Sequence, residues 1–180
     1  VEEMVRMGLD AYGIDFSESN GLRERFKKVD LQKDKYPFED ETFDIIFSKS
    51  VIEHLQNPDF LFDEAYRLLK PNGVFICMTP SWKHSYKEQF YIDHTHVTPF
   101  TRHSLELICE LSGFDAGCEY FYQLPLLWKF PALNIFRIIL NFFRLPYRPF
   151  DRVKIWSDEI NKIIRFSREA MLLAVATKRG

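Results

Sequence analysis

The chain has 180 residues and a mass of 21.5 kDa, the size of one domain around one hydrophobic core. Charged residues make up 28% of it and hydrophobic residues 46%, which excludes disordered, collagen-like and polytopic membrane chains. The net charge of -2 provides no overall positive field, so we predict no nucleic-acid partner. Cys77, Cys109 and Cys118 are widely spaced and form no CxxC pair, which argues against a disulfide scaffold or structural zinc and favours a cytoplasmic location.

Strands and helices are expected to alternate along most of the chain. Short apolar runs between turn residues predict strands, and apolar residues at helical spacing predict helices. The expected strands cover residues 10–17, the segment around Val29, and residues 43–48, 74–79, 118–123 and 171–178, and the expected helices cover residues 1–8, 57–69 and 101–112. Residues 70–73 should break the second helix, and Thr101 should cap the third. This alternation is typical of an α/β fold with a mostly parallel sheet that helices cover on both sides.

Residues 124–168 depart from this alternation and are expected to form an apolar, basic insertion before the last strand. Between Phe121 and Phe150 there is no acidic residue. Residues 132–144 predict a strongly amphipathic helix, and residues 155–169 predict a more ordinary one. The polar positions of the first helix form one narrow cationic stripe, made of Asn134, Arg137, Asn141 and Arg144.

Three explanations for residues 132–144 stay open. A membrane-spanning helix is the least favoured, because prolines and charged residues interrupt the window of about 20 apolar residues that a span needs. A helix lying in an anionic leaflet, at the cytoplasmic face of a membrane, fits the composition. A substrate lid or a homodimer surface would instead bury the apolar face within protein.

Four strings carry a resemblance to a known family. They are GIDFS at 13–17, VDL at 29–31, PFEDETFDIIFSKSVIEHL at 37–55 and LLKPNGVFI at 68–76. Together they resemble the class I S-adenosylmethionine-dependent methyltransferases of the small Rossmann-like type. The resemblance implies a mostly parallel sheet with an antiparallel last strand, and it divides the chain into a partial core (1–123), the insertion (124–168) and a closing strand (169–180).

The resemblance also marks what the sequence lacks. The first strand of the family and its glycine-rich loop, which cradles the methionine part of the cofactor, would precede Val1. We therefore expect an N-terminally truncated sequence that binds S-adenosylmethionine poorly as written. A degenerate relative of the family is the alternative.

Three pairs of residues correspond to the cofactor-binding positions of the family. The resemblance places Asp15, with Phe16 beside it, at the ribose hydroxyls, and an ionised carboxylate can accept hydrogen bonds from both. Asp30 and Leu31 correspond to the residues at the adenine ring. Ser48 and Lys49, at the end of the strand expected at 43–48, correspond to residues near the amino-acid end of the cofactor. Turn and strand-end positions without a ligand are the alternative for these residues.

Three histidines are the candidate catalytic groups. Methyl transfer needs an acceptor held at attack distance and a group that takes its proton, and a neutral imidazole titrates near physiological pH. His54 follows Glu53 in the Glu-His motif, and a packing role is its alternative. His94 and His96 lie in DHTHVTPFT at 93–101, which resembles a segment of family members with glycan or lipid-linked acceptors. A loop packed by its own aromatic residues is the alternative there.

We predict no metal ion from the sequence. Some quinone-pathway methyltransferases with a similar Glu-His motif carry a further acidic residue three positions earlier, and that cluster is associated with a divalent metal. Ser50 stands at this position, which leaves only Glu53 and His54 as candidate ligands.

The sequence thus predicts S-adenosylmethionine-dependent methyl transfer to a small-molecule, glycan or lipid-linked acceptor, at oxygen rather than at carbon or nitrogen. A non-catalytic methyltransferase-like module that binds a membrane surface or a protein partner is the main alternative. A nicotinamide-dependent dehydrogenase also places a carboxylate after its second strand, as Asp15 is here, but Asp30 and the LLKPNG string argue against it.

Overall fold

The computed structural model describes residues 1–17, 25–85, 89–124, 129–143, 145 and 157–180. Its strands are β1 (Gly13–Asp15), β2 (Phe26–Lys28), β3 (Phe43–Lys49), β4 (Leu69–Pro80), β5 (Phe114–Tyr122) and β6 (Ala170–Lys178). Its α-helices are α1 (Glu2–Arg6), α2 (Asp59–Leu68), α3 (Trp82–Ser85), α4 (Gln89–Ile92), α5 (Arg102–Leu111), α7 (Asn134–Phe142) and α8 (Asp158–Arg168). Two short 3-10 helices span Ile52–His54 and Pro131–Leu133.

The strands form a mixed sheet whose last strand in sequence lies inside it. Four strands pair in the order β3-β4-β6-β5, and β1 pairs with β2 in a separate parallel pair. Strand β4 is parallel to β3, whereas β6 runs antiparallel to both of its neighbours. The predicted α/β fold with an antiparallel last strand is therefore confirmed.

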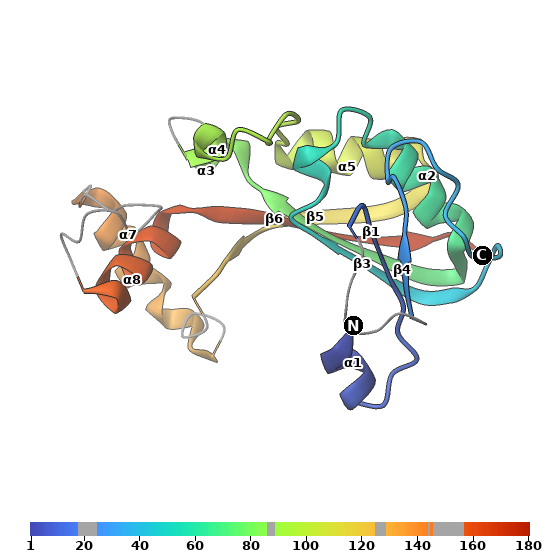
Figure 1. The fold of residues 1–180 in the computed structure, drawn as a ribbon. Coiled ribbons are helices and arrows are strands. Elements are labelled where there is room, and N and C mark those ends of the chain that lie inside the picture. Colours follow the sequence, from blue (N-terminus) through green and yellow to red (C-terminus); the bar gives the residue numbers. More distant parts are fainter. Residues whose placement is uncertain (18–24, 86–88, 125–128, 144, 146–156) are drawn as a thin grey trace.

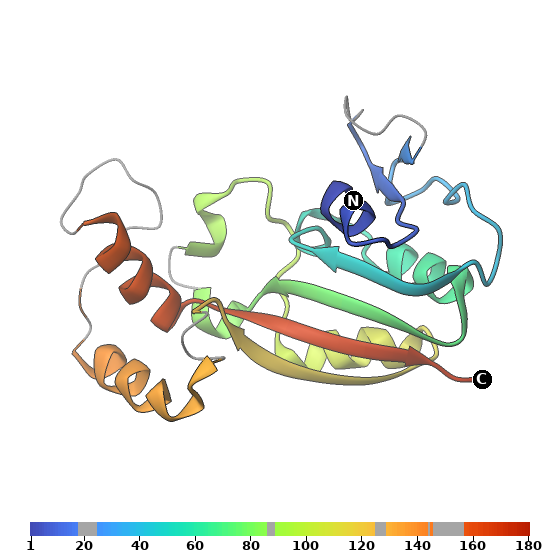
Figure 2. The same cartoon turned by 90° about the horizontal axis from the view of Figure 1, so that it is seen from below.

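Helices α2 and α5 lie side by side on one side of the four-stranded sheet (Figures 1 and 2). Phe62 of α2 and Leu105 of α5 are fully buried against Phe75 of β4 and Leu172 of β6, which are buried as well. On β3, Ile45 and Phe47 remain 62% and 48% exposed. Helix α1 lies on the other side of the sheet (Figures 1 and 2), but none of its residues is buried. Among the described residues the cover on both sides that the sequence predicted is therefore only partial.

The boundaries of α5 follow from its terminal residues. The Thr101 side chain accepts a hydrogen bond from the Ser104 amide, and the Ser104 side chain accepts one from the Thr101 amide, so a capping box begins the helix. Gly113 follows the helix with a φ of +94°, and a Cβ there would lie 3.1 Å from the Tyr66 ring. Only glycine combines this backbone conformation with that close approach.

Three strand boundaries differ from the prediction. Helix α2 ends at Leu68, and β4 begins at Leu69. Residues 70–73 therefore belong to the strand, in which Asn72 takes a φ of +63°. Pairing of Phe43 with Leu69 accounts for the early start, and the register shifts before Ile45 pairs with Val74. Strand β2 ends at Lys28, before Val29 and Asp30, and β5 begins at Phe114 because nine residues pair with β6.

Helices α7 and α8 form a lobe at the far end of β5 and β6, away from α2 and α5 (Figures 1 and 2). Both helices lie between these two strands in the sequence, as predicted for an insertion. The guanidinium of Arg137 lies 4.0 Å from the centre of the Tyr122 ring, and its Nε donates to Asn134. The predicted polar stripe is therefore partly occupied by contacts within the protein, and Arg144 lies outside the described residues.

The outer surface of α7 is apolar. Its exposed large hydrophobic side chains, with that of the next residue, are Ile135, Phe136, Ile138, Ile139, Phe142 and Phe143. Among the described residues, no helix combines the length and hydropathy that crossing a membrane requires. The interfacial and buried-face explanations for this segment remain as proposals.

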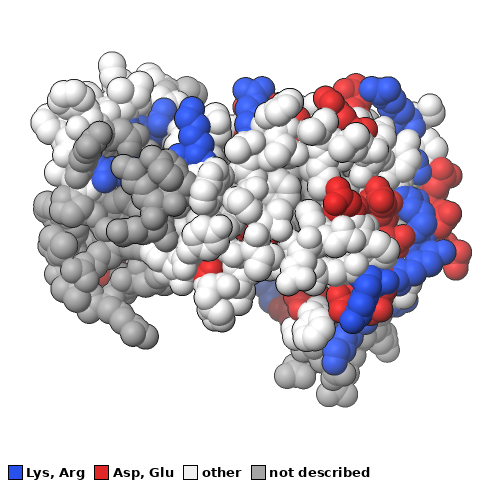
Figure 3. All heavy atoms as spheres, turned by 90° about the horizontal axis from the view of Figure 1, so that it is seen from above, with Lys and Arg blue, Asp and Glu red and all other residues white. Residues whose placement is uncertain are grey.

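Charged side chains of both signs mix at the end of the molecule where α2 lies (Figure 3). At this end Arg67 of α2 donates to Glu64 through Nε and Nη2, at 2.8 and 2.7 Å. It also donates to the backbone carbonyls of Tyr36 and Phe38, both at 3.0 Å, and to Asp40 at 2.6 Å. The Glu64 carboxylate in turn accepts the Tyr36 amide at 2.7 Å. One arginine therefore holds the loop at 36–40 against α2.

Candidate active site

The predicted cofactor-binding residues lie at or just after the carboxyl ends of β1, β2 and β3. Asp15 ends β1, and its backbone carbonyl accepts from the Val29 amide at 2.9 Å, so Asp30 follows directly beside it. The Oδ1 atom of Asp15 accepts from the amide and hydroxyl of Ser17, which orients the carboxylate at the exposed strand end. Phe16 is 69% exposed. This placement is compatible with the cofactor-binding role of Asp15 and Phe16, which stays a prediction.

Asp30 begins a turn that reaches the loop after β3. Its Oδ1 accepts from the Gln32 amide, and its Oδ2 lies 3.0 Å from the Lys33 ammonium. These contacts, led by the Gln32 amide, lower the pKa of Asp30. Leu31 packs against the core, and Gln32 Oε1 accepts the Gln56 amide at 2.6 Å. The ends of β2 and β3 are thereby tied together.

Ser48 provides a test of whether the cofactor fits here. The residue is buried, and its hydroxyl oxygen has no hydrogen-bond partner among the described residues. Lys49 is exposed, and Ser50 takes a φ of +54° as the chain leaves β3. A buried hydroxyl without a partner at this strand end is suited to the polar amino-acid end of S-adenosylmethionine. The cofactor-binding roles of Asp15, Asp30 and Ser48 stay predictions.

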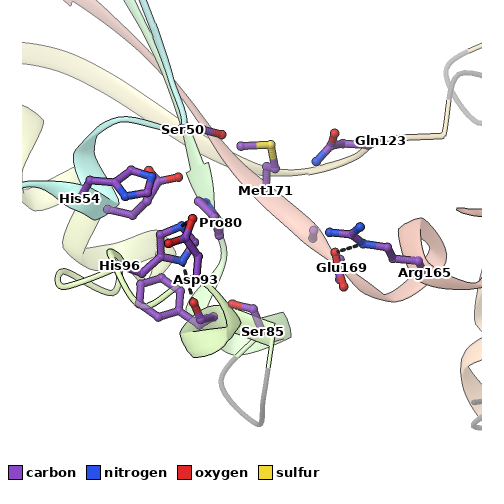
Figure 4. A pocket seen from close by; sticks show the side chains of 13 residues that line it. Ser50, His54, Pro80, Ser85, Asp93, His96, Gln123, Arg165, Glu169 and Met171 are labelled. Atoms are coloured by element: carbon purple, nitrogen blue, oxygen red, sulfur yellow. Dashed lines mark hydrogen bonds and ion pairs between the residues drawn. The ribbon is translucent and has the colours of Figure 1, made fainter. Parts of the chain in front are cut away.

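A cavity of about 310 Å³ opens next to this strand end. The residues that line it are Ser50, Glu53, His54, Pro80, Ser85, Phe90, Asp93, His96, Gln123, Arg165, Glu169, Ala170 and Met171. His54, Asp93 and His96 lie together on one side, and Arg165 and Glu169 on the other (Figure 4). The cavity therefore lies between the core and the start of the α7–α8 lobe.

His54 and His96 meet in this cavity, although 41 residues separate His54 from Thr95 and the loop that carries His96. Their rings lie edge to face with centroids 4.6 Å apart. His54 Nδ1 lies 2.8 Å from the Thr95 hydroxyl, and His96 Nδ1 lies 2.7 Å from the Phe90 carbonyl. His94 is exposed and is not among the lining residues. The structure thus brings two of the three predicted histidines together and leaves the third outside.

Glu53 joins the two histidines. Its side chain is fully buried, Oε2 accepts from the Thr79 hydroxyl at 2.8 Å, and burial raises the pKa of Glu53 above its ordinary value. Asp93 has the opposite environment, because hydrogen bonds from the side chain and amide of Thr95 lower its pKa. The ligand atoms of Glu53, His54 and His96 all lie within 4.8 Å of one another. His96, from a loop distant in sequence, thus stands beside Glu53 and His54, the two candidate ligands that the sequence offered.

Arg165 and Glu169 were not predicted from the sequence. They line the cavity from the end of α8, and Arg165 Nε donates to Glu169 Oε2 at 2.7 Å. Their four-residue spacing in the last turn of an amphipathic helix, directly before the final strand, was the signal available.

The methyltransferase domain family matches residues 1–118 of the chain. The ubiquinone/menaquinone biosynthesis C-methyltransferase UbiE of Bartonella henselae is 30% identical over 135 residues, which cover 73% of this chain and 50% of that protein. The crystal structure of a SAM-dependent methyltransferase from Archaeoglobus fulgidus is 20% identical, with a TM-score of 0.66 over 98% of this chain and 80% of that one.

Phosphoethanolamine N-methyltransferase 2 of Haemonchus contortus, solved with phosphomonomethylethanolamine and S-adenosylhomocysteine, is 21% identical, with a TM-score of 0.62 over 99% of this chain and 46% of that one. The chain belongs to the class I S-adenosylmethionine-dependent methyltransferases, and S-adenosylmethionine is the methyl donor of this class. It spans about half the length of the UbiE proteins that it matches.

Proposed function

We propose that the protein transfers the methyl group of S-adenosylmethionine to the oxygen of an apolar, hydroxyl-bearing acceptor in the cavity. The observation that carries this proposal is continuity: Ser50, one residue after Lys49, lines the same cavity as His54 and His96. Two of the proposed cofactor residues, Ser48 and Lys49, thus lie beside the cavity at the carboxyl end of β3. Ligands in open α/β sheets bind at the carboxyl ends of the strands.

The proposed chemistry is a single in-line displacement. An oxygen lone pair of the acceptor attacks the sulfonium methyl carbon, the carbon–sulfur bond breaks, and its electron pair stays on sulfur to give S-adenosylhomocysteine. The acceptor hydroxyl must lose its proton, and a neutral His54 or His96 is proposed to accept it through Nε2, since Nδ1 of each ring is engaged with Thr95 or Phe90. His94 is given no such role, because His94 does not line the cavity.

The proposed acceptor is apolar because the lobe beside the cavity is apolar. Leu133 is half-buried, and the outer surface of α7 exposes six large hydrophobic side chains that a lipid-linked molecule could contact. Methylation at a ring carbon next to the hydroxyl is the second candidate reaction. The name of the relative UbiE, a C-methyltransferase of quinone biosynthesis, favours it.

We propose, further, that α7 contacts an anionic membrane surface from the cytoplasmic side. Replacing Phe136 and Phe142, which are 59% and 82% exposed, by Asp should abolish sedimentation with phosphatidylserine vesicles, because aromatic side chains supply much of the apolar area that such helices bury. The double variant Leu107→Asp with Leu111→Asp is the matched control. Both leucines are exposed on α5, away from α7, so this variant should sediment with vesicles as the wild type does. Equal sedimentation of both double variants would contradict the membrane contact. A change in oligomeric state confined to the α7 variant would favour the dimer surface.

The proposed function is tested by titrating S-adenosylhomocysteine calorimetrically into the chain and into a version extended upstream of Val1. We expect micromolar binding by the extended version. Absence of binding by either form would favour the alternative of a non-catalytic module.

A further inference from the structure

We infer that Glu53, His54 and His96 bind a divalent transition-metal ion, of the Zn²⁺ kind, at the wall of the cavity. Their candidate ligand atoms lie within 4.8 Å of one another. A metal held at about 2.0–2.2 Å from each ligand needs these atoms about 3–4 Å apart, so small side-chain rotations complete the site. The inference does not depend on the methyl transfer proposed above, although the role of the ion in the reaction does.

The hydrogen bonds of His54 leave its other nitrogen available. The Thr95 hydroxyl lies 2.6 Å from Asp93 Oδ1 and donates its only proton there, because the carboxylate can only accept. Thr95 Oγ1 must then accept from His54 Nδ1, which lies 2.8 Å away. The proton of the neutral ring is thus fixed on Nδ1, and the lone pair of Nε2 is free to bind a metal.

His96 has the same tautomer for a different reason. Its Nδ1 lies 2.7 Å from the backbone carbonyl of Phe90, which can only accept, so in the neutral ring Nδ1 carries the proton and Nε2, 3.9 Å from Asp93 Oδ2, carries the lone pair. Metal-binding histidines usually donate their second ring nitrogen to a carbonyl, a carboxylate or a similar acceptor, which fixes the ring. Both histidines already have such a partner.

Glu53 supplies the third donor and the observation that points to a ligand. The residue is fully buried, and Oε1 has no hydrogen-bond partner among the described residues, whereas Oε2 accepts from Thr79. An unpaired buried carboxylate oxygen is costly, and a cation beside it removes that cost. Because Glu53 lines the cavity with both histidines, one ion can satisfy Oε1 and the two Nε2 atoms at once.

The donor set determines the class of ion. Two imidazole nitrogens and one carboxylate suit Zn²⁺, Fe²⁺ or a similar ion rather than Mg²⁺ or Ca²⁺, which prefer oxygen. Three protein ligands also leave a position open toward the cavity, as in catalytic rather than structural zinc sites. An acceptor hydroxyl in this position would have its pKa lowered by the ion, and its proton would leave to solvent past Asp93, which is half-exposed.

Calorimetry and Co²⁺ spectroscopy on the chelator-treated chain test the inference without any methyl acceptor. We expect one Zn²⁺ per chain at micromolar or lower dissociation constant, and visible Co²⁺ absorption of a four- or five-coordinate site. Glu53→Gln and His96→Ala should each weaken Zn²⁺ binding by at least about tenfold, because each removes one ligand. His94→Ala is the matched control and should bind as the wild type.

Two results would overturn the metal site: no Zn²⁺ binding by the wild type, or binding that neither substitution weakens. His96→Ala keeps the test valid if the buried Glu53→Gln fails to fold, since circular dichroism reports the fold of each variant. Binding of S-adenosylhomocysteine and of Zn²⁺ is measured side by side on the version extended upstream of Val1. If it binds while Zn²⁺ does not, the metal site fails and the proposed function stands; the reverse result rejects the proposed function and keeps the metal site.

Discussion

Replacing Arg67 by Met should lower the free energy of unfolding by about 3 kcal/mol, because it leaves the Glu64 carboxylate largely buried without its ionic partner. The side chains of Arg67 and Glu64 are only 18% and 10% exposed. The substitution also removes the donors to the Tyr36 and Phe38 carbonyls, which hold the loop at 36–40. Urea denaturation at pH 7 measures the change.

The same ion pair makes the effect dependent on pH. Hydrogen bonds from Arg67 lower the pKa of Glu64 below its ordinary value of 4.5, so the pair stabilises the folded chain above that pH. Its contribution is lost as the pH falls through the lowered pKa, and the difference between the wild type and Arg67→Met should shrink there. Lys70→Met is the control: Lys70 pairs with Asp44, and both are exposed, so we expect a loss of less than about 1 kcal/mol. Equal losses in the two variants would contradict the role given to Arg67.

Replacing His96 by Ala should reduce kcat by about 10²- to 10⁴-fold, which is the contribution typical of a group that assists proton removal. The assay uses the version extended upstream of Val1, S-adenosylmethionine and a polyprenylated phenol as the acceptor. The KM for S-adenosylmethionine should change little, because His96 lies in the cavity and not among the proposed cofactor residues.

His94→Ala is the matched control for this prediction, because it removes the same side chain two residues away at an exposed position. We expect its kcat to stay within about twofold of the wild type, in line with surface substitutions away from special features. An unaltered kcat together with a lower thermal stability of His96→Ala would mean that His96 only packs the loop.

Much of the core could be predicted because its signals are local. The alternating burial of β6, the Thr101 cap and Gly113 after α5 each depend on neighbouring residues in the chain. The early start of β4 could not be predicted, because Leu69 joins the strand by pairing with Phe43, which is distant in sequence. The Lys-Pro-Asn-Gly string there has the composition of a turn, and the tertiary pairing prevails over it.

The candidate site was predictable in its parts but not in its assembly. His54 and His96 stood out as titratable residues in short motifs, but only the fold places them 4.6 Å apart, measured between ring centroids. Glu53 was recognised only as part of a motif, since burial and the unpaired Oε1 are tertiary properties. The sequence could not show which of His94 and His96 lines the cavity, because this depends on how the fold orients the loop that carries both.

We propose that Asp15, at the end of β1, is part of an S-adenosylmethionine site. The most direct measurement is calorimetric titration of S-adenosylhomocysteine into the version extended upstream of Val1, with and without Asp15→Ala, and with NAD as the control ligand. We expect micromolar binding that the substitution weakens by at least about tenfold, the value of one lost pair of hydrogen bonds to a charged group, and no binding of NAD. Binding of S-adenosylhomocysteine at the same affinity by Asp15→Ala, or binding of NAD instead, would contradict it.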